Sequence, residues 1–273
     1  MDLKHERRKL FGQYGYFLLL WFVIQVFYNT PISNLNSGWT EEALLDSVKF
    51  LIWFVFGAWL IHHTRKQLAI ERPYLFNWRF KPFYYWLAAI IVYFLVVTVM
   101  QHHQIAISPK FKPEYFFQDF LIVGICEETM FRGYFLNLLL KLYDNEQTAL
   151  IIQAVMFAGI HLPRYFTTYP TLSALTIITN LITVGLLGYL FGWLFVKSHS
   201  LWPGIVTHSV WDLLVVASSG VSVKLPFISN DTASTVVCFV KMASISIKLS
   251  AVLARLRSAS GYQRMRPSSP CFS

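Results

Sequence analysis

The stretch Leu121-Ile-Val-Gly-Ile-Cys-Glu-Glu-Thr-Met-Phe-Arg-Gly-Tyr-Phe135 contains three charged residues inside an otherwise apolar run. Apolar residues are similarly dense over most of the chain, of which 55% is hydrophobic and only 14% charged. A soluble domain has about 25% charged residues, so the bilayer must be the solvent for most of this protein. Because an ionisable group inside a membrane span costs about 2.5–3.5 kcal/mol, the charges in this run indicate function.

The overall composition excludes several other classes of protein. Aromatic residues make up 17% of the 273 residues, which excludes an intrinsically disordered chain, and three cysteines are too few for a disulfide scaffold. The net charge of +9 would suggest nucleic-acid binding in a soluble protein. Here the basic residues lie between apolar runs, so we expect membrane topology and anionic lipid headgroups to account for them, and no nucleic-acid partner.

Apolar stretches of about 20 residues predict membrane-spanning helices. Seven stretches qualify: 10–28, 44–61, 83–100, 119–143, 148–162, 172–196 and 201–219. An eighth, 232–253, carries Lys241 and Lys248 on one helical face, so it either spans the bilayer or lies on it as an amphipathic helix. The expected fold is an all-α, polytopic membrane protein of about seven or eight transmembrane helices, with a polar cavity inside the bundle.

The distribution of basic residues predicts the orientation. The N-terminal tail and the second connection are rich in Lys and Arg, whereas the first connection has neither. Cytoplasmic loops carry the excess of Lys and Arg, so we expect a multi-pass protein with a cytoplasmic N-terminus.

Within the opening stretch, the spacing separates two kinds of acidic residue. Glu128 and Arg132 are four apart, acid first, which favours an ion pair along one helix face. Glu127 points about 100° away from Glu128 and has no partner on its own helix. Either all three residues form one structural polar cluster, or Glu128 and Arg132 form a structural ion pair and Glu127 carries chemistry.

Two later helices carry histidines. Phe157 and His161 are four apart near a helix end, and His208 and Asp212 are four apart, so each pair shares a helix face. Taken alone, His161 is typical of an interfacial histidine, and His208 with Asp212 is typical of an interhelical hydrogen-bonded clasp.

Depth in the membrane favours a shared site over these separate interpretations. At a rise of 1.5 Å per residue, Glu127 and His161 lie about 20–24 Å from the cytoplasmic ends of their helices, and His208 and Asp212 lie about 10 and 16 Å in, with boundary errors of several ångströms. We therefore expect these four side chains to meet if their helices are neighbours.

Together, the patterns Glu127-Glu128-x-x-x-Arg132, Phe157-x-x-x-His161 and His208-x-x-x-Asp212 resemble the three motifs of the CPBP family. This family comprises CAAX proteases and bacteriocin-processing enzymes and is also called the Abi family. The resemblance implies an intramembrane endopeptidase with a catalytic core at 117–219, after an N-terminal region of three spans at 1–116 and before a final helix and basic tail at 220–273.

The resemblance also implies roles for the motif residues. Glu127 and His161 would activate water, and His208 and Asp212 would stabilise the tetrahedral oxyanion or complete a metal site. Glu128 and Arg132 match the supporting positions. Eukaryotic prenyl proteases carry Asn at the last position, whereas bacterial members carry Asn or Asp. Because an ionised Asp cannot donate a hydrogen bond, Asp212 must be protonated, orient His208 or bind a metal.

The residue types suit two chemistries. A general base can activate water directly, or a zinc ion held by Glu127, His161, His208 and Asp212 can lower the pKa of a bound water. The spacing does not distinguish these mechanisms, so the cofactor stays open.

The function has alternatives as well. The expected partners are the lipid bilayer and a peptide or protein substrate, either a prenylated C-terminus or a peptide precursor. A non-catalytic protein of the same fold, conferring bacteriocin self-immunity or recruiting a partner, is the first alternative. An ion-coupled transporter is the second, although no related halves with broken helices are evident.

Overall fold

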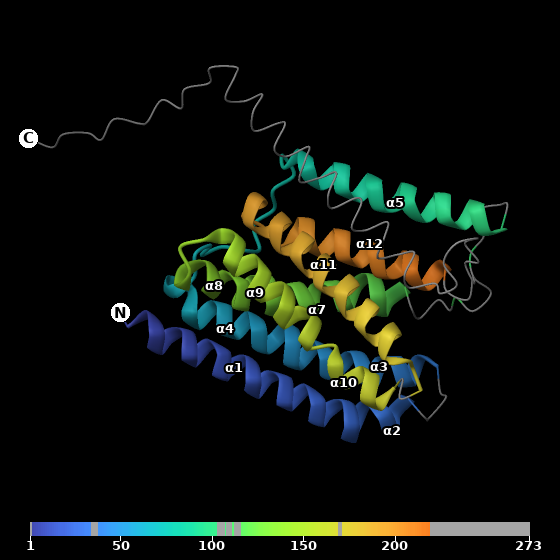
Figure 1. The fold of residues 1–273 in the computed structure, drawn as a ribbon, viewed down its shortest axis with the longest axis horizontal. Helices are drawn as coiled ribbons and strands as arrows, with labels where there is room; N and C mark the ends of the chain where they lie inside the picture. The colour runs from blue at the N-terminus through green and yellow to red at the C-terminus, as the bar shows by residue number, and fades with distance from the viewer. Residues whose placement is uncertain are drawn as a thin grey trace, which may run out of the picture.

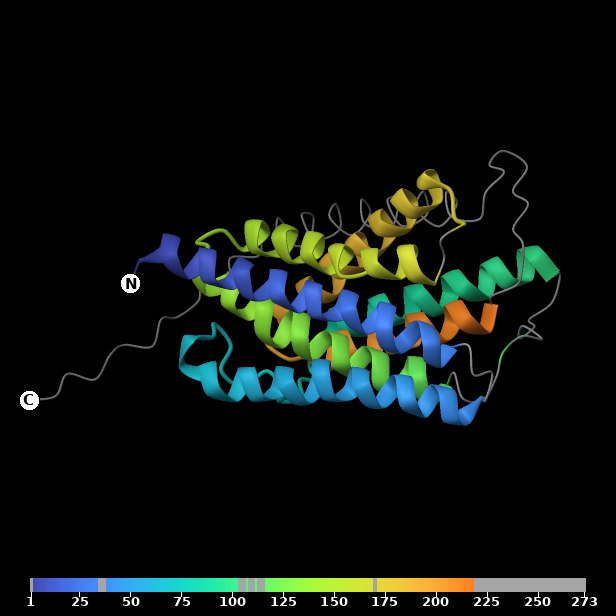
Figure 2. The same ribbon diagram turned by 90° about the horizontal axis from the view of Figure 1, so that it is seen from below.

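The computed structural model describes residues 2–33, 38–102, 107, 111, 116–168 and 171–218, and within these ranges it contains helices and no strands. The long helices lie side by side along one common direction (Figure 1). α12 packs against both α5 and α7, and α11 packs against α9. Turning the molecule by 90° shows the same elongated bundle (Figure 2). The predicted eighth helix and the basic tail lie outside the described residues.

The N-terminal region contributes three helical runs. The first begins where the Asp2 side chain accepts hydrogen bonds from the backbone of Lys4 and His5. Within the second run, the segment that follows Lys49 is π-helical. The runs comprise α1 (Leu3–Ile24), η1 (Gln25–Asn29) and α2 (Thr30–Ser33); α3 (Trp39–Lys49), η2 (Phe50–Val55), α4 (Phe56–Thr64) and η3 (Arg65–Gln67); and α5 (Lys81–His102).

The second half contains the motif-bearing helices. Asn145 caps the start of α9 through its side chain, and Ser173 caps α11. His199, in a left-handed conformation at φ 56°, ends α11. The elements are η4 (Phe116–Val123), α7 (Gly124–Glu128), η5 (Thr129–Leu136), α8 (Asn137–Leu142), α9 (Glu146–Gly159), α10 (Leu162–Thr167), α11 (Ala174–Ser198) and α12 (Trp202–Ser218).

Four helical runs among the described residues are long and apolar enough to cross a membrane: Leu3–Ser33, Trp39–Gln67, Glu146–Thr167 and Ala174–Ser198. Two motif-bearing segments are not among these four runs. One is the run from η4 to α8, which carries the charged residues described above, and the other is α12, which is 17 residues long. Large apolar side chains such as Phe27, Val155 and Leu175 are exposed on the outer surface. Such exposure suits a lipid-facing surface, so the all-α membrane fold is confirmed.

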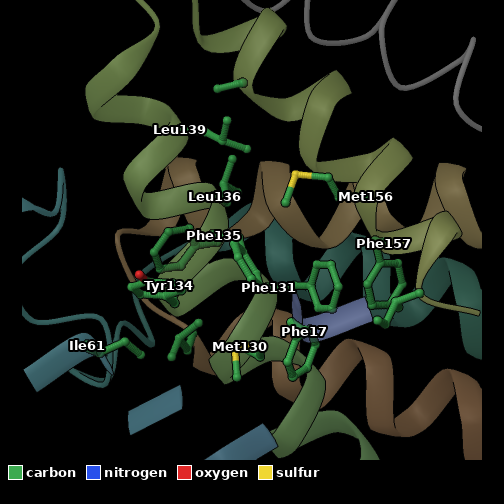
Figure 3. Close-up of a cluster of buried hydrophobic side chains, with 14 of the residues drawn as sticks. Phe17, Ile61, Met130, Phe131, Tyr134, Phe135, Leu136, Leu139, Met156 and Phe157 are labelled. Carbon is green, nitrogen blue, oxygen red and sulfur yellow. The ribbon is translucent and has the colours of Figure 1, made fainter. Parts of the chain in front are cut away.

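The interior of the bundle is dominated by the side chains of η5. Phe131 and Phe135 are fully buried and meet Phe17 of α1 and Phe157 of α9 in tilted or edge-to-face ring contacts (Figure 3). This cluster fixes the position of the helix that carries Glu127.

Small residues bring the motif helices into close contact. A Cβ atom added to Gly188 of α11 would lie 2.9 Å from Phe157 Cδ1 and 3.4 Å from Ala154 Cα, both on α9. A Cβ atom at Gly124 of α7 would overlap the Ser209 side chain of α12. Glycine at these two positions allows backbones to approach closely, as is common in membrane proteins. α7, α9, α11 and α12 are therefore neighbours, which meets the condition set by the depth argument.

Candidate active site

A cavity of about 420 Å³ lies between the motif helices and is lined by all four residues expected at the site. Glu127 comes from α7, His161 from the turn between α9 and α10, and His208 and Asp212 from α12. Residues of α3, among them Lys49, complete the wall.

Glu127 has no partner on its own helix, as expected, but it has an ion-pair partner on another helix. Lys49 Nζ lies 2.7 Å from Glu127 Oε1, and the Lys49 side chain is only 17% exposed. The sequence contained a signal for this residue, because Lys49 interrupts the apolar stretch 44–61. The rule that singles out ionisable groups in membrane spans therefore applies to a fourth helix, which the sequence analysis missed.

The second oxygen of Glu127 faces the two histidines. Oε2 is buried and has no hydrogen-bond partner among the described residues. It lies 3.9 Å from His161 Nε2 and 3.9 Å from His208 Nε2. These distances are too long for direct hydrogen bonds, but an oxygen atom at about 2.8 Å from both ends fits between atoms at this separation.

The tautomer of neutral His161 follows from its backbone contact. Nδ1 lies 2.8 Å from the carbonyl oxygen of Phe157. A carbonyl only accepts, so Nδ1 must donate, which leaves Nε2 of the neutral ring as an acceptor facing Glu127. α9 ends at Gly159, so His161 lies in a turn rather than in the helix.

His208 lies between two carboxylates. Its Nδ1 is 2.8 Å from Glu128 Oε1, and its Nε2 is 3.3 Å from Asp212 Oδ2. The ring stacks on Phe191 with 4.7 Å between ring centroids. Two facing acceptors suit an imidazolium, which has an N–H donor on each nitrogen. The contact with Glu128 joins α7 to α12 and was not anticipated from the spacing of either motif.

Glu128 and Arg132 form the ion pair that their spacing predicted. Arg132 Nη1 lies 2.8 Å from Glu128 Oε1, and both side chains are 0% exposed. Arg132 Nη2 also donates to the carbonyl oxygen of Gly188 at 3.1 Å, and the guanidinium lies 4.2 Å from the centre of the Phe157 ring. The pair therefore connects the motif helix to α11 and α9.

The donor atoms do not fit a metal ion in this arrangement. Over the described part of the chain, no group of three or more His, Cys, Asp or Glu residues is placed to hold one. The Lys49 ammonium already binds one oxygen of Glu127, and Glu128 already binds one nitrogen of His208. A zinc ion would have to compete with these contacts, so the residues in this arrangement do not fit a catalytic zinc ion.

Comparison with known proteins finds a family match. Residues 109–214 match the family described as Type II CAAX prenyl endopeptidase Rce1-like. No curated protein and no solved structure matches the chain. The matched region contains all six motif residues with assigned roles, but it does not contain Lys49. The resemblance seen in the three motifs is thereby confirmed: residues 109–214 are similar to the CAAX protease family, whose members are intramembrane endopeptidases.

Proposed function

We propose that this protein hydrolyses a peptide bond inside the membrane with a water molecule activated by Glu127 and His161, without a metal ion. The observation that carries the proposal is the position of Glu127 Oε2. This oxygen is buried, has no partner among the described residues and faces two imidazole nitrogens at 3.9 Å each. A carboxylate oxygen that faces two imidazole nitrogens in the wall of a cavity is placed to act as a general base.

Water activation uses two acceptors. A water molecule between Glu127 Oε2 and His161 Nε2 donates one hydrogen to each. Glu127 takes the proton as the water oxygen attacks the carbonyl carbon, while the hydrogen bond to His161 orients the nucleophile. General base catalysis of this kind contributes about 10²–10⁴-fold to a rate.

In this mechanism, His208 stabilises the oxyanion. When protonated, it presents an N–H from Nε2 into the cavity, while Glu128 holds the opposite ring nitrogen at 2.8 Å. The developing oxyanion accepts a hydrogen bond from Nε2, and removing one such donor typically costs about 10²–10³-fold in rate. Asp212, at 3.3 Å from the same nitrogen, helps to orient the ring and to keep it protonated until the substrate carbonyl arrives.

The last step breaks the carbon–nitrogen bond. The tetrahedral intermediate collapses, the proton held by Glu127 moves to the leaving amine nitrogen, and the new carboxylic acid keeps the oxygen from water. Glu127 thus serves first as base and then as acid, and the site returns to its starting protonation state.

We further propose that the substrate is a membrane-held peptide segment, either a prenylated C-terminus or a peptide precursor, and that the N-terminus of the enzyme lies in the cytoplasm. A substrate held in the membrane by its own apolar group reaches a cavity between membrane helices more readily than a soluble peptide does. The family description, which names a prenyl endopeptidase, favours the prenylated C-terminus.

The test uses the purified protein in detergent with a farnesylated peptide that ends in an aliphatic tripeptide and carries a fluorophore and quencher. We expect the wild type to cleave it, and Glu127→Gln and His161→Ala to be inactive while remaining folded, with a cooperative thermal transition. Lys197→Met is the matched control, because it removes another Lys–Glu pair, Lys197 with Glu146, that lies outside the cavity.

A second arm searches for natural substrates. Membrane and secreted peptides are compared between cells that contain the wild type and cells that contain Glu127→Gln. Peptides generated only by the wild type would support hydrolysis. Near-normal turnover by Glu127→Gln, or bacteriocin protection that survives this substitution, would contradict the proposed role of Glu127.

A further inference from the structure

Lys49 belongs to the active-site cavity but lies outside the region that matches the protease family. It is the last residue of α3, and it is separated from Glu127 by 78 positions in the sequence. It lies within the helical run Trp39–Gln67, which is long and apolar enough to cross a membrane. A charged side chain there is costly and is expected to have a function.

The Lys49 side chain points toward Glu127 and is mostly buried. A lysine in a membrane helix usually extends its ammonium group toward the headgroups. Lys49 Nζ instead lies 2.7 Å from Glu127 Oε1 and 5.4 Å from the centre of the Trp53 ring on the next helical turn. Trp53 is 1% exposed, so the lysine stem packs beside a buried aromatic ring.

Asp46 is a second acidic residue near Lys49, and it interacts with the ammonium group at longer range than Glu127 does. It lies three residues earlier on the same helix and lines the same cavity. The short contact that Lys49 makes is with Glu127, across the interface between two helices. The ammonium group is therefore directed at the carboxylate to which we assign base catalysis.

The contact with Lys49 makes the two oxygens of Glu127 different from each other. A free carboxylate rotates readily about its last torsion, so either oxygen could face the histidines. With Oε1 bound to Lys49, Oε2 is the oxygen that lies 3.9 Å from His161 Nε2 and from His208 Nε2. The ammonium group also offsets the burial of the carboxylate charge.

We propose that Lys49 is a positioning residue for catalysis, which holds Glu127 Oε1 so that Oε2 faces the water to be activated. This inference rests on the proposed function of Glu127. It extends the active site to α3, a helix outside the matched region. A misplacement of about 1 Å in a reacting group can reduce a rate about 10²-fold, so the loss of this contact should be visible in kcat.

The experiment measures kcat, KM and thermal midpoint in detergent for Lys49→Met and Lys49→Arg, with the farnesylated reporter peptide as substrate. Met keeps the length of the stem without the charge, and we expect kcat to fall about 10²-fold while KM stays within about twofold. Arg keeps the charge but changes the head group, and we expect a kcat about tenfold below wild type at unchanged stability. Lys197→Met should behave as wild type.

The controls separate this inference from the proposed function. Activity in Glu127→Gln would refute the role of Glu127 itself. Inactive Glu127→Gln together with wild-type kcat in Lys49→Met would overturn only the role of Lys49. If Lys49→Met does not fold, the inference is tested with Lys49→Arg alone. A wild-type kcat in Lys49→Arg would show that the contact between Lys49 and Glu127 does not position the base.

A second experiment measures stability and needs no peptide substrate. Each single variant, Lys49→Met and Glu127→Gln, leaves one buried partner alone, whereas the double variant leaves neither charge unpaired. We expect the thermal midpoint of the double variant to exceed the value predicted by adding the two single effects. Strict additivity would show that the two residues are not coupled and would overturn the inference.

Discussion

Replacement of Arg132 by Met tests the ion pair that anchors the motif helix. Arg132 and Glu128 are both 0% exposed, and Arg132 Nη1 lies 2.8 Å from Glu128 Oε1. Met fills much of the volume of the arginine stem but removes its charge, its hydrogen bond to the Gly188 carbonyl and its contact with the Phe157 ring. Glu128 then keeps His208 as its partner and loses its permanent cation.

The expected magnitude follows from the burial of the pair. Removing one partner of a buried ion pair leaves an uncompensated charge and costs about 3–5 kcal/mol. We therefore expect Arg132→Met to lower the free energy of unfolding by about this amount, and Arg132→Ala to lower it more, because Ala also leaves a cavity. The side chains of Lys197 and Glu146 are 41% and 35% exposed, so Lys197→Met should lower the free energy of unfolding by at most about 1 kcal/mol.

The assay is equilibrium unfolding by denaturing detergent in mixed micelles, followed by tryptophan fluorescence, with the amount of folded protein in membranes as a second readout. The double variant Arg132→Met/Glu128→Gln should recover part of the loss, because it removes the lone buried charge. Equal stabilities for Arg132→Met and Lys197→Met would refute the argument, since they would show that the Glu128–Arg132 pair is solvated or not formed.

Three further predictions test the site, the packing and the orientation. Asp212→Asn should keep substantial activity, because the Asn carbonyl oxygen can still accept from His208 Nε2 and orient the ring, whereas Asp212→Ala should lose activity. An inactive Asn variant together with chelator inactivation that zinc reverses would instead make Asp212 a metal ligand. Gly188→Val should destabilise the protein by about 1–3 kcal/mol in the unfolding assay through overlap with Phe157, whereas Gly12→Ala, where a Cβ meets nothing within 4 Å, should not destabilise it. A cysteine that replaces Asp2 in a functional variant should react with a membrane-impermeant maleimide only after the cells are permeabilised. Labelling in intact cells would show that the N-terminus lies outside the cytoplasm.

Local spacing accounts for the features that the sequence analysis predicted correctly. The apolar stretches indicated an all-α membrane protein because a span needs a long apolar run. Glu128 with Arg132 and His208 with Asp212 could be paired because residues four apart share a helix face. The predicted boundaries of α11 and α12 lie within two residues of the observed ones, because capping residues and apolar periodicity are local properties. The first two helical runs, Leu3–Ser33 and Trp39–Gln67, extend five to seven residues beyond the predicted stretches at each end.

The contacts that complete the site join residues far apart in the chain, and helical periodicity carries no information about them. Lys49 with Glu127 spans 78 positions, and His208 with Glu128 spans 80. Both pairs exist because small residues and the aromatic cluster around Phe131 bring separate helices into contact. The sequence by itself therefore determined the membrane fold, the catalytic candidates and the local ion pair. Only the tertiary structure decided which oxygen of Glu127 faces the histidines, because that choice depends on a cation from another helix.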